Sequence, residues 1–258
     1  MVVPKIYTNV LNQVTKETRH PQRVNTFSKG KANLGMTLGN AKIGKDTIII
    51  NLSSATLCLS ARLGLCPLGP KQFNGNGSCY ALKAERMYPQ SIAFRSLQRI
   101  QWELLEPEII ADEIFKKILL CSRLKNKARH IKYIRLNESG DFNSSNQVLK
   151  VDNVLRFLNE FCDLYNLPFI KLYTYTHRKD IFGDDMGKVL LGKLAPNFVI
   201  NGSNFMAHNE FKVLPINRKE RDLRVNGKKV NKYTCLDDCS KCSLCKADTG
   251  ITIIQAKH

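Results

Sequence analysis

Apolar residues recur along this chain in two patterns, short β-type runs and longer stretches with helical spacing. The first β-type run, residues 47–52, is largely apolar and β-branched, which is typical of a buried strand. Strands are predicted at residues 47–52, 131–136, 169–176, 198–201 and 251–254, and helices at 80–88, 92–104, 107–121, 148–162 and 186–194. Strands and helices therefore alternate, which favours parallel strands joined by right-handed crossovers.

Polar residues follow the carboxyl ends of successive predicted strands. They lie in the loop after residue 52 and at residues 138–141, 177–179 and 201–204. In a barrel of parallel strands such loops converge on one mouth, which is where enzymes of that fold place their sites. The predicted fold class is therefore α/β, a complete or partial (β/α) barrel with a C-terminal cysteine-rich metal-binding segment. An open doubly wound sheet is the alternative.

The chain divides into three expected regions. Residues 1–46 show no sustained period and are interpreted as a basic N-terminal arm or cap, residues 47–216 as the α/β barrel-like core, and residues 217–258 as a basic loop with a C-terminal cysteine-rich metal segment. No apolar run approaches the ~20 residues needed to span a bilayer, and the first residues lack the apolar core of a signal peptide. We therefore expect a cytoplasmic protein with no membrane partner.

Nine cysteines are present. In a reducing cytosol they are expected to be metal ligands or buried apolar residues rather than disulfides. Four of them, which we call the C-terminal quartet, lie within eleven residues of a polar segment: Cys235, Cys239, Cys242 and Cys245. We predict that the quartet forms a structural metal site. Its spacing suits zinc and iron–sulfur clusters equally, so the metal stays open.

Three further cysteines, which we call the N-terminal trio, lie between the first predicted strand and the helix that begins near residue 80: Cys58, Cys66 and Cys79. A loop at the carboxyl end of a buried strand is held rigidly, so three thiols there indicate a second metal site. Buried cysteines without a metal are the alternative. Cys121 and Cys162 fall on the apolar faces of predicted helices and are interpreted as core residues.

The formal net charge is +18. A field of this sign attracts phosphate backbones, so nucleic acid is the leading partner, with a solvated basic surface as the alternative. Lys5 to Lys45 contains eight Lys or Arg residues and one acid, Glu17. The second basic stretch contributes the candidate nucleic-acid-binding residues Arg218, Lys219, Arg221, Arg224, Lys228 and Lys229.

Several short motifs follow one another in a specific order. They are Cys58, Cys66 and Cys79-Tyr80-Ala81, then Arg135 with Ser139-Gly140-Asp141-Phe142, then Tyr173-Thr174-Tyr175-Thr176, then Cys239, Cys242 and Cys245 with His258. In this order they resemble the phage protein family called gene product 88, over roughly residues 47–258. The layout of that family is similar to the radical S-adenosylmethionine superfamily, in which a three-cysteine loop follows the first strand and a Gly-Gly-Glu-type motif follows the second.

The resemblance implies a role for each motif. The N-terminal trio would hold three irons of a 4Fe-4S cluster, leaving the fourth iron for the amino and carboxylate groups of S-adenosylmethionine. Tyr80 would be the aromatic neighbour of the trio. In the segment Ser139-Gly140-Asp141, the acid would receive the cationic amino group of the cofactor. Glu138 and Arg135 would position the cofactor or the substrate.

Two other function classes remain open. Glu138 to Phe142, together with Cys239, Cys242, Cys245 and His258, loosely resembles the tRNA-guanine transglycosylases, which implies a zinc-containing nucleobase-modifying enzyme. The third class is a non-enzymatic nucleic-acid-binding protein whose metal sites only stabilise the fold. His177, at a predicted strand end, is a candidate proton carrier in either enzyme, and a surface hydrogen-bond donor otherwise.

Overall fold

The computed structural model describes residues 34–122, 130–214, 224–225, 228–229, 233–235 and 238–256. Its α-helices are α2 (Leu59–Arg62), α3 (Tyr80–Met87), α4 (Gln90–Leu104), α5 (Pro107–Ser122), α6 (Ser145–Leu164), α7 (Lys179–Phe182) and α8 (Asp185–Lys193). The longer strands are β2 (Thr47–Ile50), β3 (Tyr133–Leu136), β4 (Lys171–Thr176), β5 (Phe198–Ser203), β6 (Asn209–Leu214) and β10 (Thr252–Ala256). Two-residue strands are β1 (Thr37–Leu38), β7 (Arg224–Val225), β8 (Lys228–Lys229) and β9 (Tyr233–Thr234). The expected alternation of strands and helices is confirmed from β2 to β5, whereas no described α-helix separates the strands from β5 to β10.

One eight-stranded sheet has the order β1-β2-β3-β4-β5-β6-β10-β9, and β7 and β8 form a separate antiparallel pair. Within the large sheet only β1 runs antiparallel to its neighbour. Strands β2 to β6 follow one another in chain order, whereas a doubly wound sheet reverses its order at a switch point. No described pairing joins the outer strands β1 and β9, so a mixed α/β fold is established and the barrel stays a prediction.

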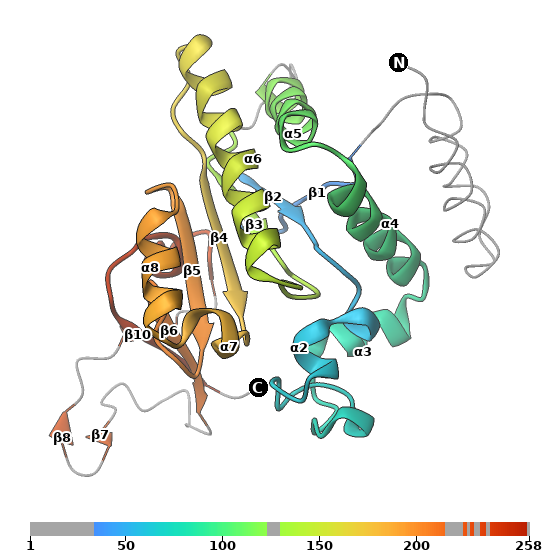
Figure 1. The fold of residues 1–258 in the computed structure, drawn as a ribbon, viewed down its shortest axis with the longest axis vertical. Coiled ribbons are helices and arrows are strands. Elements are labelled where there is room, and N and C mark those ends of the chain that lie inside the picture. The colour runs from blue at the N-terminus through green and yellow to red at the C-terminus, as the bar shows by residue number, and fades with distance from the viewer. Residues whose placement is uncertain are drawn as a thin grey trace.

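Helices cover one face of this sheet, as Figure 1 shows for α5, α6 and α8. Strand residues alternate between the two faces, and those on the helix side enter one apolar core. That core joins Ile48, Ile50, Ile134, Leu136, Leu172, Phe198 and Ile200 of the strands to Trp102, Ile110, Ile114, Val151, Leu155 and Leu158 of the helices. Cys121 and Cys162 are buried in the same core, which confirms their interpretation as core residues.

The other face of the sheet is aromatic and polar. Tyr133, Tyr173, Tyr175 and Phe211 form a chain of edge-to-face ring contacts across β3, β4 and β6. The cysteine-rich segment packs on this face, because Asn201 Nδ2 donates to the carbonyl of Cys245 at 3.0 Å. The two faces therefore differ in kind, and only one has the character of a core.

Two strands, β6 and β1, were not predicted from the apolar pattern. In β6 apolar and polar residues are mixed. Only residues 204–208 separate β6 from β5, so the sequence has no helical stretch between them that would predict a second parallel strand. Strand β1 falls in the segment expected to be an arm or cap, where Leu34 and Ile43 are buried. The rest of that segment, residues 1–33, lies outside the described residues. Within the described part of the chain, no helix is both long and apolar enough to cross a bilayer.

Candidate functional site

The N-terminal trio lies where the parallel strands end. In Figure 1, α2, α3 and α7 lie at the end of the sheet toward which the arrowheads of β4 and β5 point. Cys58 is the residue before α2, and Cys79 is the residue before α3. Cys66 lies between them, and its N–H donates to the carbonyl of Ser60 at 3.2 Å. Helix starts therefore position Cys58 and Cys79, and a backbone hydrogen bond to the α2 residue Ser60 positions Cys66.

The three thiols lie within electrostatic range of one another, and Cys58 and Cys66 also lie within range of Asp141. Burial raises the pKa of Cys58 to about 12, with smaller contributions from Asp141, Cys66 and Cys79. Burial likewise raises the pKa of Cys66 to about 11, with contributions from Cys79 and Asp141. The metal-free thiols of Cys58 and Cys66 are thus neutral at pH 7, and binding a metal must displace their protons.

Backbone N–H groups point at two of these sulfurs. The N–H of Ala61 donates to the Cys58 thiol, and the N–H groups of Leu68 and Gly69 donate to Cys66, which lowers both pKa values against the effect of burial. Gly69 is required at its position, because a Cβ there would lie 2.9 Å from the Cβ of Ala61. Donors fixed in this way favour thiolates, the form in which cysteine binds metals.

Asp141 is the residue that connects the trio to the strand ends. Its Oδ1 accepts from Thr176 Oγ1 at 2.6 Å and from the N–H of Phe142 at 2.8 Å. Its Oδ2 accepts from Ser60 Oγ at 2.6 Å and from the N–H of His177 at 2.8 Å. Both oxygens thus already accept two hydrogen bonds each. The role expected for Asp141 as acceptor of a cofactor ammonium stays a prediction, and it requires one of these donors to be released.

Glu85 is a buried acid that the sequence interpretation missed. One of its oxygens accepts from the N–H of Ala55, from Arg95 and from Ser139 Oγ, at 2.8, 2.9 and 3.2 Å. The other accepts from the N–H of Thr56 at 3.3 Å. Glu85 therefore ties the beginning of the cysteine loop to α4 and to the loop after β3. The sequence contains one indication that Glu85 is buried: it lies on the same face of the helix as the apolar residues Ala81 and Leu82.

Ser139 and Gly140 shape the loop after β3. The N–H of Ser139 donates to Asn51 Oδ1 at 2.7 Å. Gly140 has φ +83°, and a Cβ there would lie 2.7 Å from the carbonyl oxygen of Ser53. Only glycine tolerates both constraints. These two residues place Asp141, and their direct contact with a cofactor stays a prediction.

Tyr80, Glu138 and Arg135 lie beside the trio. Tyr80 Oη donates to the carbonyl of Glu138 at 2.5 Å, and an Arg135 nitrogen lies 3.4 Å from Tyr80 Oη. The Glu138 carboxylate lies 3.6 Å from Arg95 and is 26% exposed, so it has acceptor positions that Asp141 lacks. Burial lowers the pKa of His177, which favours the neutral imidazole near pH 7.

The C-terminal quartet forms a second group of thiols. Tyr175 donates its hydroxyl to Cys245, whose pKa burial raises to about 12, with contributions from the other three cysteines of the quartet. The N–H groups of Cys235 and Cys239 donate to the carbonyls of Ile254 and Lys42, at 2.7 and 2.8 Å. Backbone bonds thus attach the quartet to β10 and to the turn before β2.

Lys246 is a buried cation among the quartet. It is 4% exposed, and its Nζ lies 3.9 Å from the centre of the Tyr133 ring and donates to the carbonyl of Cys239 at 2.7 Å. Burial lowers its pKa, opposed by Asp46 and by Cys239, Cys242 and Cys245. Among the described residues Lys246 forms no ion pair with a carboxylate. Thiolates on the quartet would supply the missing negative charge.

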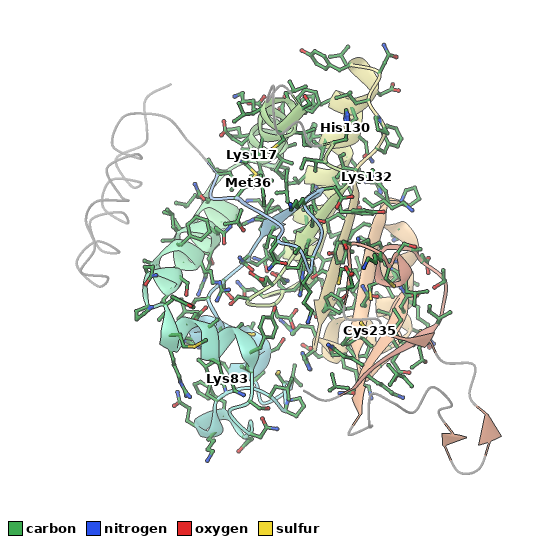
Figure 2. All side chains as sticks on the ribbon, turned by 180° about the vertical axis from the view of Figure 1, so that it is seen from behind. Met36, Lys83, Lys117, His130, Lys132 and Cys235 are labelled. Carbon is green, nitrogen blue, oxygen red and sulfur yellow. The ribbon has the colours of Figure 1, made fainter. Side chains whose placement is uncertain are left out.

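The trio and the quartet are separate groups. The cysteines that influence the pKa values of Cys58 and Cys66 belong to the trio, and those that influence the pKa of Cys245 belong to the quartet. Figure 2 shows the same separation, with Cys235 by the C-terminal strands and Lys83 on α3 elsewhere in the molecule. In the described parts of the chain, no three Cys, His, Asp or Glu side chains are close enough to hold one metal ion. Both groups offer soft sulfur donors, and hydrogen-bond donors point at Cys58, Cys66 and Cys245. A metal at the trio or at the quartet stays a prediction.

The basic loop falls largely outside the described residues. Arg218, Lys219 and Arg221 are among those that are not described. Arg224 lies in β7, and Lys228 and Lys229 form β8, whose backbone pairs with β7. The prediction that these residues bind nucleic acid therefore rests on charge and sequence alone. His258, also named from the sequence, lies outside the described residues.

Comparison with known proteins gives one family match. The sequence model of the family described as gene product 88 matches residues 24–248. No curated protein and no solved structure showed significant similarity to the chain. The family match spans both groups of cysteines, the motif around Asp141 and all strands from β1 to β9.

Proposed function

We propose that this chain, which belongs to the gene product 88 family, binds a 4Fe-4S cluster through Cys58, Cys66 and Cys79 and acts as a radical S-adenosylmethionine-like enzyme on or near nucleic acid. The observation that carries the proposal is the position of the three thiols in the loop at the carboxyl ends of parallel strands, where they influence one another and Asp141 lies within electrostatic range of Cys58 and Cys66. Enzymes with parallel strands place their chemistry at this end.

Three thiolates leave one iron of a four-iron cluster open to a further ligand. When bound, the cluster and S-adenosylmethionine would supply the reductive chemistry, and the chain would supply orientation and a pocket that excludes water. The N–H groups of Ala61, Leu68 and Gly69 support this assignment, because they stabilise negative charge on Cys58 and Cys66. The partly exposed Glu138 carboxylate is available for a cationic group, while Asp141 holds the loops in register.

The quartet has a different role in this proposal. It lies on the aromatic face of the sheet, attached to β10 and to the turn before β2, and would bind zinc or an iron–sulfur cluster as a structural site. The second candidate function is a zinc-containing transglycosylase-like enzyme. The geometry of the quartet favours it, since four thiols beside the buried Lys246 also suit zinc. A non-enzymatic nucleic-acid-binding protein is the third.

Nucleic acid is the proposed partner because of the net charge of +18. Each phosphate contact made by Lys or Arg changes the slope of log affinity against log salt by about 0.9 on duplex DNA. Replacing Lys228 and Lys229 by Gln should therefore flatten the slope, whereas replacing Lys188, which is paired with Asp185 on α8, should not. If the protein binds no nucleic acid at low salt, its positive charge only forms a solvated surface.

The enzymatic proposal is tested by reductive cleavage of S-adenosylmethionine with anaerobically reconstituted protein. The wild type and Cys162→Ala should cleave the cofactor, since Cys162 lies on α6 in the helix-side core and does not belong to the trio. Cys66→Ser should not. If none of the three proteins cleaves S-adenosylmethionine, the proposed radical S-adenosylmethionine-like activity is contradicted. If all three contain zinc in place of iron, the transglycosylase-like alternative is supported.

A further inference from the structure

Arg135 and Tyr173 lie next to each other on the aromatic face of the sheet. Their Cα atoms are partners in the parallel register of β3 and β4. Their neighbours Ile134, Leu136 and Leu172 enter the helix-side core, so Arg135 and Tyr173 point to the opposite face. Tyr173 is 1% exposed, whereas Arg135 is only partly buried. Of the two residues, Arg135 is therefore the one with contact to solvent.

Each of these side chains has a buried donor without an acceptor among the described residues: Arg135 Nε and Tyr173 Oη. An unsatisfied buried donor is destabilising, so two of them on adjacent residues call for an explanation. Arg135 also has no ion pair with any described carboxylate. Its contacts are Tyr80 Oη at 3.4 Å and the ring of Tyr175, whose centre lies 5.5 Å from the guanidinium carbon.

The chemistry of the pair selects the ligand. A guanidinium presents a fork of donors that matches the oxygens of a phosphate or a carboxylate, and a phenol adds one more donor. Burial raises the pKa of Tyr173, so its hydroxyl stays protonated and able to donate. The buried ammonium of Lys246, 5.8 Å from the centre of the Tyr173 ring, adds positive potential on the same face.

We propose that Arg135 and Tyr173 bind an oxyanion group, a phosphate or a carboxylate, of the molecule on which this protein acts. The inference deepens the proposed function, because Tyr80, which contacts Arg135, directly follows Cys79 of the trio. It thus places the anionic end of the substrate on the sheet and the reacting end toward the cysteine loop. Anion binding itself needs no metal, so the two proposals can fail separately.

The test is the thermal stabilisation of the full-length protein by inorganic phosphate and by acetate, at an ionic strength held constant with chloride. A bound anion stabilises the folded state by mass action. Tyr173→Phe should have equal or higher stability without added anion, because it removes an unsatisfied hydroxyl, and should bind the anion about tenfold more weakly, as expected for a lost hydrogen bond to a charged group. Arg135→Gln should lose the binding. Arg99→Gln, which removes a surface arginine paired with Glu103, should keep it.

Each outcome decides the proposal. Stabilisation by phosphate but not acetate identifies a phosphoryl ligand, and the reverse a carboxylate. Equal stabilisation of the wild type and all variants shows general attraction to the basic surface and overturns the proposal, as does the absence of stabilisation of the wild type. If Arg135→Gln does not fold, unchanged affinity in Tyr173→Phe still overturns it. Anion binding retained in a Cys66→Ser variant that cleaves no S-adenosylmethionine separates this site from the fate of the cluster.

Discussion

Ser60 donates a hydrogen bond of 2.6 Å to Asp141, and this bond joins the cysteine loop to the loop after β3. The residues are 81 positions apart in sequence. With Thr176 and the N–H of His177 on the same carboxylate, three strand-end loops meet at one buried charge. The trio is thus positioned by hydrogen bonds that do not involve any metal.

Replacing Asp141 by Asn should destabilise the protein by about 3 kcal/mol. The amide presents a nitrogen where the carboxylate accepts from Ser60 and the N–H of His177, so buried donors lose their acceptor, and bonds to a charged group are worth about 1.5–3 kcal/mol each. Urea unfolding measures the change. Asp112→Asn, on the surface beside Lys116, should change stability by less than about 1 kcal/mol. Equal effects of both substitutions would show that Asp141 has no organising role.

Two glycines should respond to alanine in opposite directions. Gly140→Ala should be strongly destabilising, because φ is +83° and the new Cβ would meet the backbone of Ser53. Gly192 lies in α8, and a Cβ there meets nothing within 4 Å, so Gly192→Ala should stabilise by about 0.5–1 kcal/mol. Melting temperatures of the two variants test the loop geometry. A Gly140→Ala protein as stable as the wild type would show that the loop after β3 has a different conformation.

Lys246→Met should leave the stability of the metal-free protein unchanged or raise it, and should weaken the binding of zinc. In the metal-free chain it removes a buried charge that has no described carboxylate partner, so the melting temperature should stay equal or rise. With metal bound, it removes the cation beside the thiolates, and zinc affinity should fall about tenfold, or about 1.4 kcal/mol. Zinc titration against a competing chelator measures this. Lys241→Met, with 79% of its side chain exposed, is the control. Unchanged zinc affinity in Lys246→Met would refute the role of Lys246 as a counter-ion.

Asp180 gives a pH-dependent contribution to stability. Its hydrogen bond with the buried Arg178 lowers the pKa of Asp180 below its ordinary value of 3.8. A lowered folded-state pKa means that the stabilisation is present above about pH 4 and is lost as the pH falls through the folded-state value. Asp180→Asn should therefore melt lower than the wild type at pH 6, and the difference should shrink toward pH 3. The effect should be below about 1 kcal/mol, because the Asp180 side chain is 42% exposed. A difference that grows on acidification would contradict the assignment.

The strands and helices could be predicted because their apolar periods coincide with what is buried. Ile48 and Ile50 enter the core as an apolar strand should, and Cys121 and Cys162 lie on apolar helix faces. The capping of α6 by Ser144 and of α8 by Asp184 is also readable from sequence, since both residue types favour that position. Local pattern and tertiary burial agree at these places.

The site could be predicted only in part. The sequence indicated the candidate residues, but the partners of Asp141 come from distant loops, and no local period brings Ser60 to Thr176. Glu85 was missed because a buried acid on a helix has the same local pattern as an exposed one. The pair Arg135–Tyr173 depends on the register of two strands, which alternation within each strand does not specify.

The central claim, that the N-terminal trio holds an iron–sulfur cluster, is tested most directly by iron and sulfide content with an absorption spectrum after anaerobic purification. The decisive variant replaces Cys239 and Cys242 by Ser and leaves the trio intact. We predict that it keeps about four irons per chain and the broad visible absorption of a 4Fe-4S cluster, while Cys58→Ser and Cys66→Ser in the same background lose both. The account would be contradicted if the double variant Cys239→Ser, Cys242→Ser is folded and has a reduced trio but contains no iron.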